Sequence, residues 1–334
     1  MNAPRIPLPR FVQIEPVGQC NLRCAMCPIQ YRHAGPPWGA PALMPYADFE
    51  RLLASFPDVK ELHLQGLGEP LMHPDFFRMV EHAVGKGITV STNTNLTLLT
   101  PRRVEQCVRS GLHAMHVSID GASAPVYEKI RRGASFHKVL RNLERLVAAR
   151  MALRSTTPEL RIVNVVMRSN LHELKDLVAL AHRHGVTSVF VQHLSHDFGE
   201  GTLPHAYYAM RDFVRGESLL AEDSARVARC FGEARAAAST LGIELRLPSL
   251  DTAPAGPRAR GCHWPSQGAY VTFEGDALPC CMVSTADRMN MGNMLTDGVA
   301  AVWDGAAYGE LREGLRAGSP PAICRSCAVY NRTF

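Results

Sequence analysis

The chain has 334 residues, of which 46% are apolar and 20% charged, and its formal net charge is +5. This balance excludes a disordered chain, and the small excess of positive charge, without a run of basic and aromatic residues, argues against a nucleic-acid partner. There is no apolar run of the roughly 18 residues that a membrane helix needs and no signal peptide at the start, so we expect a cytoplasmic protein of about two domains with no membrane partner.

Between residue 11 and about residue 200, short runs rich in Val and Ile alternate with helical patterns. We expect strands at Phe11–Glu15, Glu61–Gln65, Ile88–Thr92, Ala114–Ile119, Arg161–Val166 and Thr187–His193. Repeated strand–helix units predict a parallel sheet, and these six units are too few for a closed barrel of eight. The pattern alone leaves two alternatives, an open partial barrel and a doubly wound sheet.

Some of the helices between these strands have clear N-terminal signals. Thr100 and Pro101 are typical of an N-cap followed by the first helical residue. Asn170 and Glu173 predict a capping box at the start of another helix. Residues 205–242 are expected to be helical.

The sequence changes character after this helical region. Residues 248–261 are rich in turn residues and predict a linker. The residues that follow predict a small cysteine-rich domain, with a hairpin over residues 269–279 and helices near residues 299–303 and 307–317. The domains that we expect are residues 1–245 and 246–334.

The ten cysteines are concentrated at the two ends of the chain, which in a cytosolic protein indicates metal or redox chemistry. Cys20, Cys24 and Cys27 have the spacing CxxxCxxC directly after the first expected strand, where a parallel α/β fold places its active site. Thiolates favour iron–sulfur clusters, zinc and copper(I), and a zinc site needs a fourth ligand, for which His33 is the candidate nearby. Three thiolates on a four-iron cluster leave one iron open to a cofactor or substrate.

This spacing resembles the hallmark of the radical S-adenosylmethionine (SAM) enzymes, with Met26 where that family usually has an aromatic residue. The resemblance implies an α/β fold with a partial (β/α)6 TIM-like barrel and a [4Fe–4S] cluster whose open iron is chelated by SAM. It also implies that reductive cleavage of SAM yields a 5′-deoxyadenosyl radical, which abstracts a substrate hydrogen. A flavodoxin or ferredoxin would supply the electron.

Further segments resemble this family in the same chain order. Residues 66–70, Gly-Leu-Gly-Glu-Pro, are similar to its GGEP-type segment, with Leu67 in place of the first glycine. The resemblance implies SAM-binding roles for Gly66, Gly68, Glu69, Asn93, Asn95, Ser118, Asp120 and Arg131. Gly68 would bond the amino group of SAM, Ser118 its ribose and Arg131 its carboxylate. Taken one at a time, these residues are also typical of turns, of loop caps and of charged residues exposed on a helix surface.

The C-terminal cysteines are similar in spacing to those of the SPASM and twitch domains attached to some radical SAM enzymes. The resemblance implies one auxiliary [4Fe–4S] cluster ligated by Cys262, Cys280, Cys324 and Cys327. Four thiolates saturate such a cluster, which suits electron transfer. Cys281 has three alternative roles: a ligand in place of Cys280, a thiol that donates hydrogen to a substrate radical, or a buried bystander. Cys107 and Cys230 are expected in the core.

A polar group follows the sixth expected strand. His193, His196 and Asp197 are expected to contact substrate or to act in acid–base steps, with a structural role as the alternative.

Three hypotheses for function follow. The first is an enzyme that dehydrogenates a small alcohol, sugar or aminocyclitol with help from the auxiliary cluster; the lack of a small domain for binding a leader peptide favours this small-molecule substrate. The second is a maturase or epimerase acting on a ribosomally made peptide or a sugar, with Cys281 as the hydrogen donor. The third is a non-catalytic metal-binding scaffold.

Overall fold

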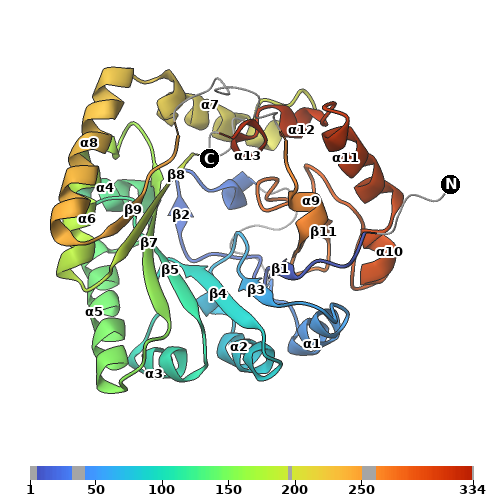
Figure 1. Cartoon of the computed structure of the whole chain (residues 1–334), viewed down its shortest axis with the longest axis horizontal. Coiled ribbons are helices and arrows are strands. Elements are labelled where there is room, and N and C mark those ends of the chain that lie inside the picture. Colours follow the sequence, from blue (N-terminus) through green and yellow to red (C-terminus); the bar gives the residue numbers. More distant parts are fainter. Residues whose placement is uncertain (1–5, 32–41, 195–197, 250–260, 333–334) are drawn as a thin grey trace.

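A curved nine-stranded sheet forms the centre of the molecule in a computed structural model that describes residues 6–31, 42–194, 198–249 and 261–332 (Figure 1). The strand order is β11-β10-β1-β3-β4-β5-β7-β8-β9. The strands are β1 (Phe11–Ile14), β3 (Glu61–Leu64), β4 (Thr89–Thr94), β5 (Ala114–Ser118), β7 (Glu159–Val166), β8 (Ser188–His193), β9 (Glu244–Arg246), β10 (Gly268–Val271) and β11 (Ala277–Leu278). Every pairing in this sheet is parallel except that between β10 and β11.

The strand order decides between the two architectures that the sequence left open. From β1 to β9 the strands lie side by side in the order of the chain, so the sheet has no point at which the winding reverses. The fold is therefore a partial barrel of the TIM type, open between β9 and β11, and not a doubly wound sheet. All six expected strands are confirmed, and β9 is a further parallel strand that the sequence analysis did not predict.

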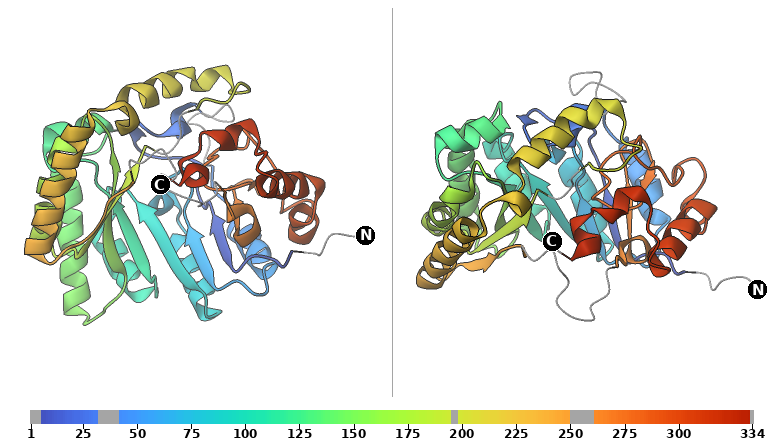
Figure 2. Two further views of the ribbon diagram at one scale, coloured as in Figure 1. Left: turned by 45° about the horizontal axis from the view of Figure 1, so that its top comes forward. Right: turned by 90° about the horizontal axis from the view of Figure 1, so that it is seen from above.

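Helices cover the convex face of the sheet (Figures 1 and 2). They are α1 (Tyr46–Ala54), α2 (Phe76–Gly85), α3 (Pro101–Arg109), α4 (Ala124–Ile130), α5 (Phe136–Ala152), α6 (Leu174–Arg183) and α8 (Ser224–Leu241), while α7 (Tyr208–Glu217) lies over the upper rim. The predicted N-cap is confirmed, because Thr100 Oγ1 accepts a hydrogen bond from the amide of Arg103. No described helix is long and apolar enough to cross a membrane.

The predicted capping box at Asn170 is wrong. The Asn170 side chain makes no cap bond to its helix; it accepts from the amide of Met167 and donates to the carbonyl oxygens of Asp120 and Val165. Glu173 instead accepts from the amide of Ala122 at 2.6 Å. Both side chains therefore hold the loop after β5 against the end of β7, which is a contact between distant parts of the chain.

The two faces of the sheet differ in character. Along β5, Met115 and Val117 are fully buried against the helices, whereas Ala114, His116 and Ser118 are only half-buried. Strand residues alternate between faces, so the second set lies on the concave face. This face is polar and partly open, unlike the packed interior of a closed barrel.

The C-terminal residues extend the barrel sheet. They form α9 (Trp264–Gln267), the predicted β10–β11 hairpin, α10 (Val299–Trp303), α11 (Ala306–Arg316), α12 (Ala322–Arg325) and α13 (Ala328–Asn331). Strand β10 pairs in parallel with β1, so that Val12 lies beside Ala269. Val12, Ala269 and Trp303 share one hydrophobic core. A domain boundary between residues 245 and 246 remains a proposal, and it would fall within β9.

Candidate active site

The first cysteine cluster lies on a loop held at the carboxyl end of the sheet. Within this loop, β2 (Arg23–Cys24) pairs with β6 (Arg131–Arg132) in an antiparallel ladder that places Cys24 opposite Arg131. The amide of Ala25 also donates to the carbonyl oxygen of Ile130 at 2.9 Å. These contacts tie the cysteine loop to the end of α4, more than a hundred residues farther along the chain.

Most of the predicted first-site residues line one cavity of about 270 Å³, which we call the carboxyl-end cavity. Its predicted members are Cys20, Cys24, Cys27, Gly66, Gly68, Glu69, Asn93, Asn95, Ser118 and Arg131. Asp120 does not line it but is bonded to Arg131. Met26, the departure from the family pattern, also lines the cavity. None of these three cysteines forms a disulfide bond.

The glycines of the segment after β3 are required by close packing. A Cβ atom on Gly68 would lie 1.9 Å from the carbonyl oxygen of Val17, and one on Gly66 would lie 2.3 Å from Cγ of Glu15. The amide of Leu67 donates to Glu15 Oε1 at 2.9 Å. The segment therefore lies directly against the backbone that leads from β1 to the cysteines, where no larger residue fits at Gly68.

Glu69 and Asn95 brace the cavity wall. The carboxylate of Glu69 is buried and accepts hydrogen bonds from Thr94 Oγ1 at 2.6 Å and from the amide of Asn95 at 2.8 Å. Asn95 Nδ2 in turn donates to Asn21 Oδ1 at 3.0 Å and lies 3.8 Å from Cys20 Sγ. Burial raises the pKa of Glu69, and these hydrogen bonds oppose that effect. Glu69 therefore holds Asn95 in place, and Asn95 in turn positions the cysteine loop.

Asp120, Arg131 and Cys24 form a connected polar group. Arg131 Nε donates to Asp120 Oδ2 at 2.6 Å, and Arg131 Nη1 lies 3.8 Å from Cys24 Sγ. Asp120 is fully buried, and its other carboxylate oxygen accepts from the amide of Val165 at 2.7 Å. Arg131 thus places a positive charge beside a cysteine thiol and at the cavity wall.

The donor set of the carboxyl-end cavity fits a metal cluster. Burial raises the pKa of Cys20 and Cys24, because a buried thiolate loses its solvation and needs compensating positive charge, part of which Arg131 supplies beside Cys24. A metal ion or cluster supplies that charge and deprotonates coordinating thiols. No three His, Cys, Asp or Glu side chains in the described residues come close enough together to hold a single metal ion.

The sequence analysis did not assign several residues of the cavity wall. Gln65, Val165, Gln192 and Ser284 also line the carboxyl-end cavity. The first three lie at or just beyond the carboxyl ends of expected strands, so alternation along those strands is the signal that points to them. Nothing in the sequence points to Ser284, which comes from the C-terminal region.

The C-terminal cysteines surround a second, smaller cavity of about 40 Å³, which we call the C-terminal cavity. Its wall includes Cys262, Cys280, Cys281, Cys324 and Cys327 among apolar residues. Burial and the neighbouring Cys327 raise the pKa of Cys324 to about 12. This thiol-rich apolar site also fits a metal cluster, which would compensate the thiolates.

A loop connects the two cavities, and we call residues 281–288 the bridging loop. It is anchored to the segment before α7, where Arg288 Nε donates to Glu200 Oε1 at 2.8 Å in a fully buried ion pair. The Arg288 guanidinium also lies 4.4 Å from the ring centre of Phe198. The Tyr207 hydroxyl lies 3.0 Å from Thr285 Oγ1. The loop is therefore rigidly docked on the barrel.

The two predicted catalytic residues that the structure describes, His193 and Cys281, do not line the carboxyl-end cavity. His193 is buried, and its Nε2 bonds the carbonyl oxygen of Ser249 at 2.6 Å, so it positions the backbone that follows β9. Cys281 lies in the wall of the C-terminal cavity and is absent from the described wall of the carboxyl-end cavity. His33, His196 and Asp197 lie outside the described residues. Cys107 is buried in the core, and Cys230 packs against it, as predicted.

Sequence comparison matches the Radical SAM superfamily over residues 14–181, which is half of the chain. The chain belongs to the radical SAM superfamily. A second match, to an iron–sulfur cluster-binding SPASM domain, covers residues 262–328. This radical SAM protein accordingly uses SAM and a [4Fe–4S] cluster, with auxiliary iron–sulfur binding in its SPASM domain.

Several named proteins are similar to this radical SAM enzyme. Mycofactocin maturase MftC of Mycobacterium ulcerans is 31% identical over 276 residues, covering 80% of this chain and 67% of that protein. The tungsten-containing aldehyde ferredoxin oxidoreductase cofactor-modifying protein of Pyrococcus furiosus is 27% identical over 324 residues, covering 90% and 82%. SuiB of Streptococcus suis, bound to its precursor peptide SuiA, has the same fold with a TM-score of 0.69 and 17% identity, covering 97% of this chain and 70% of that one.

Proposed function

We propose that this radical SAM enzyme is a maturase that modifies a peptide. The observation that carries the proposal is the convergence of Cys20, Cys24 and Cys27 and the Gly66-to-Glu69 segment on one cavity at the carboxyl ends of the strands. The peptide substrate is supported by the similarity to a maturase and to a structure with a bound precursor peptide. The comparisons give no support to dehydrogenation of an alcohol or sugar, which the sequence analysis placed first.

Each group of residues has a role in this proposal. Cys20, Cys24 and Cys27 would hold the [4Fe–4S] cluster, and the polar wall of the carboxyl-end cavity would hold SAM. Together the two cofactors supply a 5′-deoxyadenosyl radical when bound. Gly68 leaves its backbone exposed to the cofactor, and Ser118 faces the same space from the end of β5. Arg131 contributes the positive charge for a carboxylate.

The C-terminal cysteines would hold the auxiliary cluster through Cys262, Cys280, Cys324 and Cys327. Loss of a hydrogen atom from the substrate leaves a radical, and further loss of one electron and one proton gives an oxidised product. The bridging loop contributes Cys281 to the wall of the C-terminal cavity and Ser284 to that of the carboxyl-end cavity, and this shared loop supports a route for that electron away from the substrate. Return of hydrogen by Cys281 has no such support, because Cys281 is absent from the described wall of the carboxyl-end cavity.

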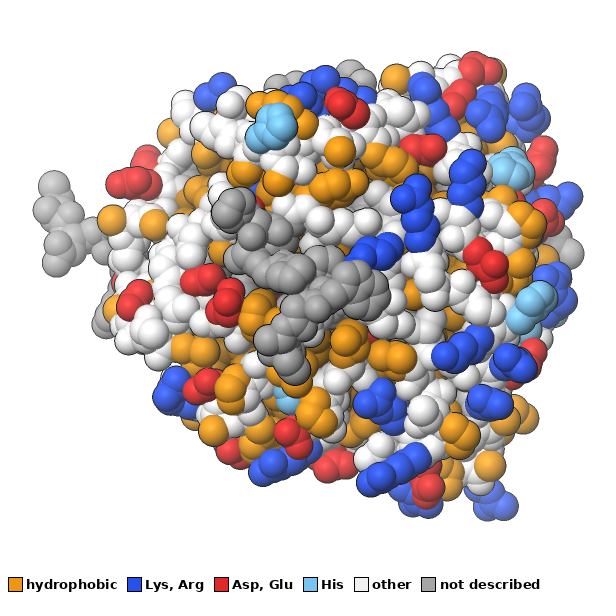
Figure 3. Space-filling view, turned by 180° about the vertical axis from the view of Figure 1, so that it is seen from behind, with side chains coloured by type: hydrophobic (Ala, Val, Ile, Leu, Met, Phe, Trp, Pro, Cys, Tyr) orange, Lys and Arg blue, Asp and Glu red, His pale blue; other side chains and the backbone are white. Residues whose placement is uncertain are grey.

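An acidic flavodoxin or ferredoxin is the proposed source of the electron that starts the reaction, and a cytoplasmic location is part of the same proposal. Arg23 and Arg132 lie opposite each other on β2 and β6, next to Cys24. Figure 3 shows further Lys and Arg side chains, interspersed with Asp and Glu, over the right half of the view. Positive charge of this kind steers an acidic partner toward the protein.

Anaerobically reconstituted protein tests the proposal. With dithionite and SAM, the wild type should bind iron and form 5′-deoxyadenosine, and Cys24→Ala should form none. Cys327→Ala should retain SAM cleavage but lose conversion of a peptide substrate, and Cys230→Ala is the matched control that should retain both. Short peptides encoded beside the gene are the substrates to screen, with mass spectrometry in deuterated water as the readout.

The outcomes separate the hypotheses. Loss of two hydrogens from a peptide supports oxidative maturation, whereas gain of one solvent deuterium without oxidation indicates epimerisation. Zinc binding without iron, or no 5′-deoxyadenosine, would show a scaffold instead of an enzyme.

A further inference from the structure

Polar side chains pair across neighbouring strands along the concave face of the sheet. The pairs are Gln13–Gln65, His63–Ser91, Asn93–His116 and Arg161–Ser188, with hydrogen-bond distances of 3.2, 2.8, 2.9 and 2.9 Å. A closed barrel fills this space with layers of branched apolar side chains. Here the pairs form a partly open polar surface. Gln65 and Asn93 of these pairs also line the carboxyl-end cavity, and the proposed chemistry there does not use the others.

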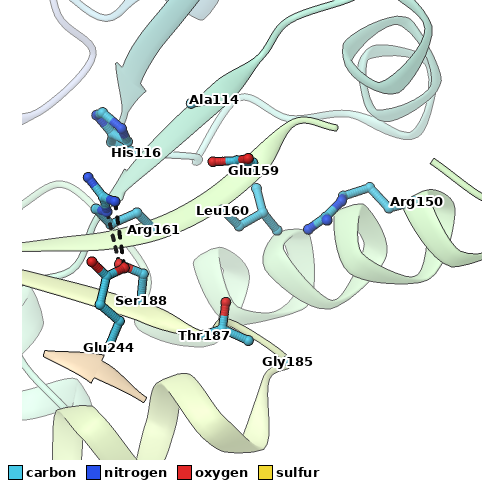
Figure 4. Close-up of a pocket in the computed structure, with 10 residues that line it drawn as sticks. All are labelled: Ala114, His116, Arg150, Glu159, Leu160, Arg161, Gly185, Thr187, Ser188 and Glu244. Carbon is cyan, nitrogen blue, oxygen red and sulfur yellow. Dashed lines mark hydrogen bonds and ion pairs between the residues drawn. The ribbon is translucent and has the colours of Figure 1, made fainter. Parts of the chain in front are cut away.

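This surface ends at a cavity of about 390 Å³ at the amino ends of β5, β7, β8 and β9, which we call the amino-end cavity (Figure 4). Arg161 lies near its centre, between His116 and Glu244, while Arg150 approaches from α5 and Glu159 from the start of β7. Two cations and two carboxylates from three separate elements, α5, β7 and β9, therefore meet in one hollow.

The two cavities are stacked along the same face of the same strands. Val165 in the wall of the carboxyl-end cavity and Arg161 in the wall of the amino-end cavity are four residues apart on β7, so both face the concave side. Four residues of strand span about 13 Å. A ligand in extended conformation that reaches from one cavity to the other covers about four residues of peptide.

The Arg161 guanidinium is only loosely engaged by the protein. Its Nε donates to Ser188 Oγ, but Nη2 lies 3.7 Å from Glu244 Oε2, in a pair whose side chains are 40% and 71% exposed. An exposed pair at this distance contributes little free energy, so a carboxylate from a ligand can replace Glu244. Arg150 Nε is buried and has no hydrogen-bond partner among the described atoms.

His116 adds a neutral hydrogen-bonding group beside Arg161. Burial, and then the charge of Arg161, lower the pKa of His116 to about 4, so its ring is uncharged near neutral pH. Its Nδ1 bonds Asn93 Oδ1, which makes Nδ1 the donor and leaves Nε2 as an acceptor. The cavity therefore offers cationic donors from arginine and an acceptor suited to a peptide N–H.

We propose that the amino-end cavity binds a carboxylate of the peptide substrate through Arg161 and Arg150, about 13 Å below the carboxyl-end cavity. The inference rests on the proposed function for the identity of the substrate. It adds that the peptide carries an acidic side chain, or its own C-terminal carboxylate, about four residues from the modified position. Glu159 and Glu244 at the edge of the cavity disfavour ligands with several negative charges.

Equilibrium dialysis of the reconstituted protein, with SAM present, tests this site with three small probes. N-acetylglutamate methylamide carries a side-chain carboxylate, N-acetylglutamine methylamide is its neutral equivalent, and N-acetylglycylglycine carries a C-terminal carboxylate. The wild type should bind one of the two acidic probes at least about tenfold more tightly than the neutral one. The acidic probe that binds more tightly identifies the source of the carboxylate.

Two variants with opposite expected effects on binding of the acidic probe make the test specific. Arg161→Gln should remove the preference for the acidic probe, whereas Glu244→Gln should strengthen its binding about threefold because a competing carboxylate is gone. Arg229→Gln, on the exposed surface of α8, is the matched control and should change nothing. Equal binding of acidic and neutral probes by the wild type, or an unchanged preference in Arg161→Gln, would overturn the proposal.

The proposed function is measured separately on the same samples. All four proteins should bind iron and cleave SAM equally, which also shows that the variants fold. Failure to cleave SAM or to modify any peptide, with Arg161-dependent probe binding intact, would contradict the proposed function. It would not contradict the proposal that the amino-end cavity binds a carboxylate.

Discussion

Cys281 and Ser284 lie three positions apart in the chain but in the walls of two different cavities. The Ser284 hydroxyl donates to the carbonyl oxygen of Cys281 at 3.3 Å, and the Ser284 backbone has a φ of +71°. A left-handed conformation is unfavourable for serine, so surrounding contacts must hold it there. The ion pair of Arg288 with Glu200 is one of these contacts. A tightly turned loop thus joins the two cysteine-rich sites.

Ser284→Leu should impair binding of SAM. The larger side chain would extend into the carboxyl-end cavity, of about 270 Å³, that the proposed function assigns to this cofactor. We expect SAM affinity to fall at least about tenfold, measured by equilibrium dialysis of anaerobic protein. Ser319→Leu, at an exposed position in the same region, is the control. Equal affinity in both variants would mean that Ser284 does not border the cofactor.

Arg288→Met should destabilise the fold. The Arg288 and Glu200 side chains are 1% and 3% exposed, so removal of the arginine leaves a buried carboxylate without its partner. The free energy of unfolding should fall by about 3 kcal/mol, measured by urea unfolding under anaerobic conditions. Arg316→Met breaks the exposed pair with Glu313 and should cost less than about 1 kcal/mol. A similar loss in both variants would contradict the rigid docking of the bridging loop.

Gly68→Ala should disrupt the segment after β3. Its added methyl group meets the carbonyl oxygen of Val17, which is backbone and has little freedom to move. We expect a loss of about 3 kcal/mol in the free energy of unfolding, with loss of SAM binding. Gly85→Ala, where nothing lies within 4 Å of the new methyl group, should instead raise stability by about 0.5 kcal/mol. Thermal denaturation of the two glycine variants checks the predicted loss and the predicted gain of stability.

Acid should destabilise the protein through His63 and His116. Burial lowers the pKa of each to about 4, and the unfolded chain titrates near the ordinary value of 6.5, so between these values the unfolded state binds more protons. Stability should therefore fall as pH decreases from 6.5 to 4, by at most about 1.4 kcal/mol per pH unit for each histidine. His116→Asn should flatten this dependence in urea titrations. Arg161→Gln should raise the pKa of His116, seen by NMR.

Local patterns in the sequence predict much of the sheet and the chemistry of the site. Hydrophobic periodicity located the six expected strands, because alternation and length are properties of each segment alone. The N-cap at Thr100 is local in the same way. The capping box predicted at Asn170 is wrong for the opposite reason. The Asn170 side chain bonds Asp120, fifty residues away, and no local sequence pattern shows that this distant contact replaces the bond to the helix.

What the sequence by itself determined is the set of reactive groups: the CxxxCxxC spacing, the glycine segment after β3 and the C-terminal cysteines. What only the tertiary structure decided is which residues share a cavity. The pairing of β10 with β1 brings Ser284 to the first site, and the open barrel leaves His116 and Arg161 on a partly exposed concave face. These arrangements depend on strand order and on contacts between distant residues, and the free energy of such contacts exists only in the folded chain.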